Sequence, residues 1–111
     1  MSLSISKEVR GEVAVIHVEG DLDVYTAPRL KEDVDAASSA GSRLIVDLTD
    51  VHFIDSTALG VLVAAHQRSQ SDGHDFRLVV EDPFLLKIFR ITGFDGVFSI
   101  FSQLNDALSY D

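Results

Sequence analysis

The stretch of sequence that decides the fold is Phe53-Ile54-Asp55-Ser56-Thr57-Ala58-Leu59-Gly60. It follows a strand-like run, residues 43–48, and leads into an apolar pattern with helical spacing, residues 56–71. Ser56 therefore stands where a loop becomes a helix, directly after an aspartate. A hydroxyl in that position is either a helix cap or a reactive group presented to a partner, and the residues taken alone favour the N-cap.

The part of the chain before this stretch predicts a β-hairpin followed by a helix. Residues 3–6 alternate apolar and polar side chains, as an edge strand does, and residues 13–18 suit a strand that is covered on both faces. Residues 10–12 form the turn between them. Thr26 is predicted to cap the helix that follows, with Pro28 in its first turn. The positions of that helix expected to be buried are Ala27, Leu30, Val34 and Ala37.

The middle of the chain predicts a central strand and a second helix. Leu44, Val46 and Leu48 indicate the strand, and the connection at residues 50–54 is expected to turn its apolar side chains inward. The helix spans residues 56–71. One face of it is formed by Leu59, Leu62, Val63 and His66, which we interpret as core positions, with the histidine partly buried.

The last third predicts two more strands, residues 76–80 and 97–100, each followed by a helix. Asp82 is predicted to cap the first of these helices, with Pro83 at its first position and Gly93 as a left-handed residue at its end. Its buried positions are expected to be Leu85, Ile88 and Phe89. For the final helix, the cap is expected to be Ser102 and the buried positions Leu104, Ala107 and Leu108.

The predicted element order is β-β-α-β-α-β-α-β-α, which makes the chain an α/β protein with a mixed sheet of four to five strands and about four helices. Helices between the later strands predict parallel crossovers. A length of 111 residues with 46% apolar side chains suits one compact domain, residues 1–111.

The charge of the chain limits its partners. Nine Lys and Arg side chains face 18 Asp and Glu side chains, for a formal net charge of −9. Such a chain would repel nucleic acid and anionic membranes, so basic protein surfaces are the favoured partners, although the charge could serve solubility alone. There is no cysteine, no signal-peptide pattern and no apolar run longer than residues 58–65. We expect a soluble, intracellular protein without contact with nucleic acid or membrane.

The residues show no pattern of an enzyme. The four histidines lack the spacing of a helical zinc site, and there is neither a glycine-rich phosphate loop nor a Gly-x-Ser-x-Gly motif. We therefore expect no catalytic residues, no cofactor and no resident metal.

Acidic side chains near the predicted strand ends form a candidate site around Ser56. Asp21 and Asp23 follow the second strand, Asp47 lies near the end of the third, and Asp55 directly precedes Ser56. If those strand ends lie side by side, the carboxylates form a rim around one hydroxyl. The simpler interpretation is a set of turn and capping aspartates, and the alternative is a magnesium site, which is disfavoured because Mg²⁺ in proteins usually binds with help from phosphate.

Three motifs, in order, resemble a known family. Residues 55–60 resemble the Asp-Ser-[Ser/Thr]-Gly-Leu-Gly signature of the STAS domain, and more narrowly of the bacterial anti-sigma factor antagonists. Residues 20–28 resemble the family's Gly-[Glu/Asp]-[Leu/Ile]-Asp-x-x-[Thr/Ser]-Ala stretch, and residues 86–93 resemble its late helix ending in Gly. The chain departs from the signature at Ala58, where the family usually has Gly.

The resemblance implies a STAS-type fold and a cytoplasmic regulatory role. Members of the family bind an anti-sigma factor that is also a serine kinase of the histidine-kinase-like ATPase fold, and this binding frees the sigma factor. The kinase phosphorylates the serine that corresponds to Ser56, the antagonist is released, and a PP2C-type phosphatase resets it. The residues then expected to contact or position the partner are Asp21, Asp23, Tyr25, Thr26, Asp47, Asp55, Thr57 and Ala58.

Other functions stay open from the sequence. The same module could serve a stressosome or a transport complex, it could bind a small ligand or nucleotide, or it could be a scaffold whose serine is never modified. The length of the chain and the Asp55-Ser56-Thr57 motif favour the antagonist.

Overall fold

The structure, a computed structural model, describes residues 3–109. Within that range the elements follow the predicted order. They are β1 (Leu3–Arg10), β2 (Val13–Leu22), α1 (Ala27–Ser38), β3 (Arg43–Ile54), α2 (Ser56–Ser71), β4 (Asp75–Val79), α3 (Pro83–Thr92), the short 3-10 helix η1 (Phe94–Gly96), β5 (Ser99–Phe101) and α4 (Leu104–Ser109).

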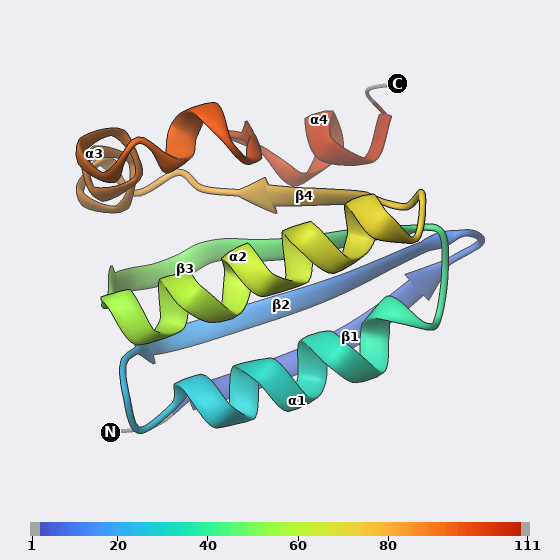
Figure 1. Ribbon diagram of the computed structural model, residues 1–111, viewed down its shortest axis with the longest axis horizontal. Helices are drawn as coiled ribbons and strands as arrows, with labels where there is room; N and C mark the ends of the chain where they lie inside the picture. The colour runs from blue at the N-terminus through green and yellow to red at the C-terminus, as the bar shows by residue number, and fades with distance from the viewer. Residues whose placement is uncertain (1–2, 110–111) are drawn as a thin grey trace.

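The strands form one mixed sheet in the order β1-β2-β3-β4-β5 (Figure 1). The hairpin β1–β2 is antiparallel, and every later neighbour is parallel, which confirms the expected crossovers. A parallel sheet brings the carboxyl ends of its strands to one edge. The loops that follow β2 and β3 therefore meet at the same edge of the sheet.

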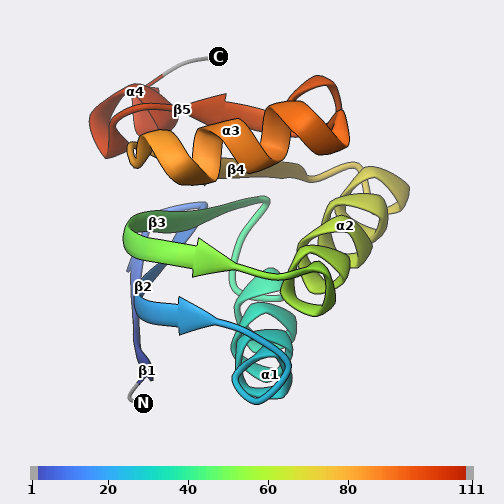
Figure 2. The ribbon, with the colours of Figure 1, turned by 90° about the vertical axis from the view of Figure 1, so that its left-hand side faces the viewer.

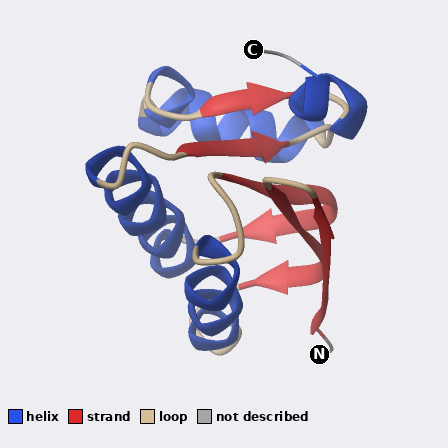
Figure 3. Cartoon of the chain, turned by 90° about the vertical axis from the view of Figure 1, so that its right-hand side faces the viewer, coloured by secondary structure: helices blue, strands red, loops and turns tan. Residues whose placement is uncertain are grey.

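Helices cover both faces of the sheet. Figures 2 and 3, which view the molecule from opposite sides, show α1 and α2 together on one face, with α4 beside β4 and β5 away from them. Alternation along β3 divides its side chains accordingly, since Val46 belongs to the large core under α1 and α2 whereas Ile45 packs against Ala107 of α4. Residues 13–18 divide in the same way, which confirms a strand covered on both faces. None of the helices in the described range is long and apolar enough to cross a membrane.

Several predicted strand boundaries are wrong. β1 and β2 each run four residues further than residues 3–6 and 13–18, so Asp21, which was expected to follow the second strand, lies within it. Residues 50–54, expected to be a connection, continue β3 to Ile54 and pair with the end of β2 across two register shifts. The shifts break the regular alternation that identifies a strand in a sequence. Val51 and Ile54 point inward as expected, but Phe53 is 41% exposed. The last strand begins at Ser99 rather than residue 97, because η1 and the buried Phe98 precede it.

Two glycines with opposite surroundings offer a matched test of the packing. Gly41 lies in the loop that leads into β3, and a methyl group on it would overlap the backbone carbonyl group of Glu12. A methyl group on Gly60, in the middle of α2, would meet no atom within 4 Å. We expect Gly41→Ala to lower the free energy of unfolding by about 1–3 kcal/mol through overpacking. Gly60→Ala should raise it by about 0.5–1 kcal/mol through helix propensity. Urea denaturation of both variants measures this, and equal effects of the two substitutions would contradict the packing.

A histidine bridges three strands on the side of the sheet away from α1. His17 on β2 hydrogen-bonds through Nε2 with Glu8 on β1 at 2.7 Å and through Nδ1 with Asp47 on β3 at 2.8 Å. Partial burial acts to lower the pKa of His17, but the hydrogen bonds to the two carboxylates outweigh it and raise this pKa above its ordinary value of 6.5. The protonated ring therefore stabilises the folded state.

The bridge predicts a pH-dependent stability. Because the folded pKa of His17 is raised, its contribution is full below about pH 6.5 and disappears as the pH rises through the folded pKa. The free energy of unfolding of wild type should therefore exceed that of His17→Gln more at pH 6 than at pH 8.5, by at most about 1 kcal/mol because the ring is partly exposed. Urea titrations at both pH values measure the difference. A larger wild-type advantage at pH 8.5 than at pH 6 would refute the assignment.

Candidate functional site

The ends of β2 and β3 bring the predicted site residues together. Leu22 pairs with Ile54, and the backbone N–H of Asp55 donates to the carbonyl oxygen of Leu22 at 3.0 Å. The loop from β2 into α1 therefore lies beside the start of α2, at the edge of the sheet that faces the viewer in Figure 2. The residues gathered there are Asp21, Asp23, Tyr25, Thr26, Asp55, Ser56 and Thr57.

The loop between β2 and α1 is fixed by its own side chains. Oδ1 of Asp23 accepts from the N–H groups of Tyr25, at 2.9 Å, and Thr26, at 3.0 Å. The hydroxyl of Thr26 donates to the carbonyl oxygen of Asp21 at 2.9 Å and accepts from the N–H of Asp23. Thr26 occupies the cap position of α1, but its side chain does not cap the helix, so that prediction is wrong. The hydroxyl instead closes a turn that holds Tyr25 outward with 87% of its surface exposed.

The start of α2 is capped by Asp55 rather than Ser56. Asp55 has an extended backbone, and its carboxylate accepts from the N–H of Ala58 at 3.0 Å. Ser56 is the first residue of the helix and is exposed. The expectation that Ser56 itself is the N-cap is therefore wrong. Within residues 3–109 the structure gives its hydroxyl no hydrogen bond, so the group is free for chemistry at a helix N-terminus whose first N–H groups also lack helical partners.

The positions after Ser56 divide between surface and core. Thr57 is exposed and borders a groove of about 250 Å³ between α1 and α2. Ala58 has no exposed surface, so its methyl group does not face a partner. It is also an ordinary helical residue, because no residue other than glycine has a positive φ in the described chain. Leu59 and Leu62 are buried, and Val63 packs against the same core.

Asp47 does not belong to the site. β3 continues for seven residues beyond it to Ile54, a span of roughly 20 Å in a strand. Its carboxylate is engaged by His17 and by the N–H of Thr49, at 3.0 Å. The prediction of a rim that includes Asp47 is wrong because the third strand is longer than its sequence pattern indicates. No three His, Cys, Asp or Glu side chains in the described residues gather in a way that could hold a metal ion.

Three side chains near this edge were missed from the sequence. Val24 is 53% exposed, next to Tyr25, and Phe53 lies opposite Asp21 in the register of the two strands. His52, directly before Phe53, hydrogen-bonds through Nδ1 with the carboxylate of Asp82. That bond raises the pKa of His52 and joins the end of β3 to the start of α3. The exposed apolar residues had no sequence signal, because the register shift that turns Phe53 outward depends on the pairing of β2.

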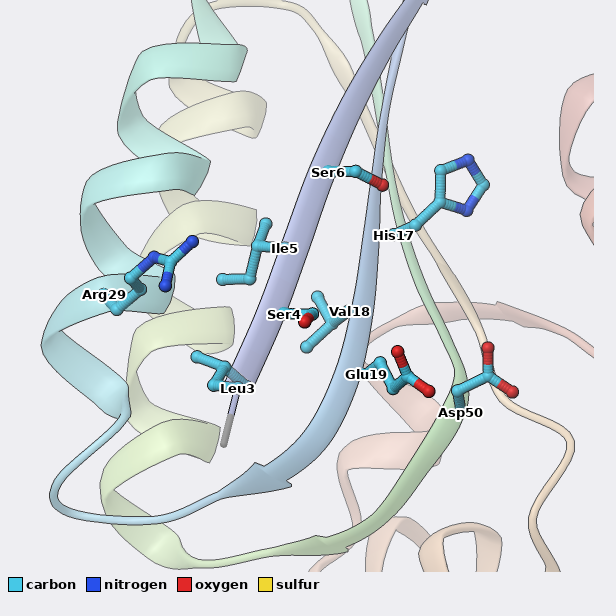
Figure 4. A pocket seen from close by; sticks show the side chains of 9 residues that line it. All are labelled: Leu3, Ser4, Ile5, Ser6, His17, Val18, Glu19, Arg29 and Asp50. Atoms are coloured by element: carbon cyan, nitrogen blue, oxygen red, sulfur yellow. The ribbon is translucent and has the colours of Figure 1, made fainter. Parts of the chain in front are cut away.

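A hollow larger than the groove between α1 and α2 lies elsewhere. It has a volume of about 700 Å³, runs along the edge strand β1 and contains none of the predicted site residues. Figure 4 shows that Leu3 and Ile5 point toward Arg29 of α1, whereas His17, Glu19 and Asp50 lie on the other side of the strand. The hollow therefore wraps around the edge strand β1 and is not a closed pocket for a small ligand.

Comparisons with known proteins agree with this fold. The family model of the STAS domain matches residues 4–107. An anti-sigma-B factor antagonist from Listeria monocytogenes is 35% identical over 102 residues, which cover 90% of this chain and 90% of that protein. The crystal structure of an anti-sigma factor antagonist from Mycobacterium paratuberculosis superposes with a TM-score of 0.89 at 29% identity, covering 97% of this chain and 92% of that one.

A more distant structure shares the fold alone. It is the Bacillus cell fate determinant SpoIIAA in its phosphorylated form, which has a TM-score of 0.72 at 19% identity and covers 95% of this chain and 96% of that one. The resemblance inferred from three short motifs thus extends over nearly the whole chain. The match to the family model across residues 4–107 establishes that the chain belongs to the STAS domain family.

Proposed function

We propose that this chain is a cytoplasmic anti-sigma factor antagonist that is switched by phosphorylation of Ser56. In this scheme it binds an anti-sigma factor that is also a serine kinase of the histidine-kinase-like ATPase fold, and so frees a sigma factor. Phosphorylation of Ser56 ends the complex, and a PP2C-type phosphatase restores it. The chain acts by binding and is not itself the enzyme. Its relatives named anti-sigma factor antagonists support the first part of this proposal.

The observation that carries the proposal is the state of the Ser56 hydroxyl. It is exposed on the first turn of α2, and no hydrogen bond in the described residues engages it. Capping is supplied by Asp55, so the serine has no structural task at that position. A kinase could take its proton and transfer a phosphoryl group without first breaking a contact of the fold.

The same position can accept a phosphate without unfolding. A phosphoserine carries about −1.5 to −2 charges at pH 7. The N-terminus of an α-helix favours negative charge through its free N–H groups and its dipole. Ser56 lies at the first helical residue, where both effects are strongest. The fold of the antagonist should therefore be retained after modification.

Binding is far more sensitive than folding to the added charge. Asp55 precedes Ser56 and Asp23 lies in the neighbouring loop, so a phosphate adds charge to a surface that is already negative. Two unit charges 4 Å apart interact by about 4 kcal/mol at an effective dielectric constant near 20. A loss of only about 2.8 kcal/mol weakens binding a hundredfold. A local charge change is thus sufficient to release a partner.

The neighbouring residues have distinct roles in this proposal. Asp23 and Asp55 position the hydroxyl or the basic groups of the partner, and Asp21 belongs to the same edge. Tyr25 is held outward by the turn that Thr26 closes, and it would offer the partner an apolar surface, as would the exposed Val24 and Phe53. Thr57 contacts the partner where the groove between α1 and α2 begins.

Substitutions of Ser56 test the switch. Affinity capture from the native lysate, with wild type, Ser56→Ala and Ser56→Asp as baits, should retain a small ATPase-fold kinase with the first two only. The purified kinase should phosphorylate wild type but not Ser56→Ala, and Ser56→Asp should bind it about a hundredfold more weakly. Melting temperatures should not change, because the hydroxyl makes no contact that the fold needs.

A matched control adds the same charge at the other end of the helix. Ser71→Asp places a carboxylate at the last residue of α2, roughly 22 Å away along the helix axis. It should leave kinase binding unchanged. If all baits retain the same proteins, or if Ser71→Asp releases the kinase as well as Ser56→Asp does, the proposed switch is wrong.

Substitutions of Asp55 separate its capping role from its role in binding. Asp55→Asn keeps an oxygen that accepts from the N–H of Ala58, so its free energy of unfolding should lie within about 0.5 kcal/mol of wild type. Asp55→Ala loses the cap and should cost about 1 kcal/mol. If the carboxylate also positions the partner, both variants should lower kcat/KM for phosphorylation of Ser56 at least tenfold. A normal rate for Asp55→Asn would limit Asp55 to the cap.

A further inference from the structure

The outward face of α3 carries large apolar side chains. Phe84 is 51% exposed and Ile91 is 72% exposed. They stand seven residues apart, close to two turns of an α-helix, so they lie on one stripe about 10 Å long. Leu85 and Phe89, on the opposite side of the same helix, have no exposed surface and pack the helix onto the core. The outer stripe is therefore additional to what the fold requires.

A basic stripe runs beside this apolar one. Lys87 and Arg90 follow Phe84 by three and six residues, which places them on the neighbouring side of the exposed face. The helix has no acidic residue. Arg90, in the last turn, also suits the helix dipole, but Lys87 lies in the middle, where that effect is weak. The outer face of α3 thus combines two apolar anchors with two cations, and we call these four residues the α3 face.

The cations of the α3 face differ from most others in the chain. Six of the nine Lys and Arg side chains have a carboxylate oxygen within 3.6 Å. In the part of the chain that the structure describes, no ion pair involves Lys87 or Arg90. In a protein of net charge −9, two unpaired cations beside exposed apolar groups form a local surface of opposite sign. Such a surface complements an acidic ligand.

The α3 face is held in place at both ends of the helix. The carboxylate of Asp82 accepts from the N–H groups of Phe84, at 2.8 Å, and Leu85, at 3.3 Å, and also bonds with His52 of β3. Gly93 ends the helix in a left-handed conformation with φ of 79°. A ligand would therefore meet a surface that is already ordered, which lowers the entropic cost of binding.

We propose that the α3 face is a docking surface for an acidic, amphipathic segment of a partner protein, independent of Ser56. Two apolar side chains of that segment would cover Phe84 and Ile91, and its carboxylates would pair with Lys87 and Arg90. Phe84 and Ile91 stand at the i, i+7 spacing at which amphipathic helices present their apolar anchors.

Two other occupants fit the charges less well. A second copy of the chain that paired α3 with α3 would bring Lys87 and Arg90 close to their own counterparts, between two bodies of charge −9. An anionic membrane would attract the two cations but repel the rest of the acidic chain. An acidic protein segment satisfies the local charge without either penalty.

The probe for the test is a 16-residue synthetic helix with Leu at two-turn spacing and Glu on both flanks. Titration into ¹⁵N-labelled protein should shift the amide resonances of α3 from Phe84 onward and those of its neighbours, since Pro83 has no amide proton. The double variant Lys87→Glu/Arg90→Glu should weaken binding at least tenfold, and so should Phe84→Ser/Ile91→Ser. Raising the salt concentration from 50 to 300 mM should also weaken it, because exposed charges are screened.

Matched controls separate this site from general charge effects and from the switch. Arg29→Glu/Lys31→Glu reverses two cations that are ion-paired on α1, and should leave the affinity unchanged. Ser56→Asp should also leave it unchanged, so failure here and failure of the proposed switch are distinguishable. Circular dichroism would verify that each variant is folded.

Four outcomes would overturn the proposal. They are absence of binding, shifts that map to another surface, equal weakening by the α1 double variant, and binding that survives reversal of Lys87 and Arg90. Two arms without the peptide identify the alternatives. Dilution of the protein alone would shift α3 resonances if a second copy covered the α3 face. Vesicles of three parts phosphatidylcholine to one part phosphatidylserine would shift them if the surface bound lipid.

Discussion

The parallel pairing of β2 with β3 is the constraint on which the site depends. Because the two strands end at the same edge of the sheet, the segment from Asp21 at the end of β2 to Thr26 and the start of α2 meet there, although some thirty residues separate them in the chain. The hydrogen bond from the N–H of Asp55 to the carbonyl oxygen of Leu22 fixes this contact at 3.0 Å. Both segments rest on strands with fully buried side chains, so the exposed groups at the edge have a rigid support. Any partner that contacts Ser56 must also meet this loop.

Capping by Asp55 gives Ser56 its chemical freedom. An N-cap serine commits its oxygen to a backbone N–H, and a kinase would have to break that hydrogen bond before it could phosphorylate the serine. Here the cap lies one residue earlier, so the hydroxyl of Ser56 projects from the first turn without a structural task. The same division of labour occurs at the neighbouring loop, where Asp23 binds the backbone and leaves Tyr25 outward. In both places an aspartate binds the backbone and a residue close after it faces the solvent, Ser56 after Asp55 and Tyr25 after Asp23.

The element order, the buried helix positions and the cap of α3 could be predicted because each depends on residues close together in the sequence. Asp82, Pro83 and Gly93 specify the ends of one helix by local geometry alone. The errors arose where a distant strand decides the outcome. Asp47 looked like a strand end only because the pairing of residues 50–54 with β2, and its register shifts, cannot be derived from alternation. Phe53 is exposed for the same reason. Thr26 and Ser56 are both plausible caps by residue type. At α2 the cap is Asp55, one residue before Ser56, and at α1 the Thr26 hydroxyl bonds within the preceding turn and leaves the helix without a side-chain cap.

The two proposed surfaces differ in sign, and this difference has an energetic consequence. The edge around Ser56 is acidic, so a phosphate there strengthens a repulsion, whereas the α3 face is basic and remains attractive in either state. The bond between His52 and Asp82 places the start of α3 next to the end of β3, so one partner of ordinary interface size could reach both. A contact at the α3 face worth about 1.4 kcal/mol would tighten every complex tenfold. It would do so equally before and after phosphorylation, because its groups do not include Ser56. The ratio of the affinities of the unmodified and the phosphorylated protein would then depend only on the residues around Ser56. The α3 face would set the absolute affinity, and so the concentration range in which the switch operates.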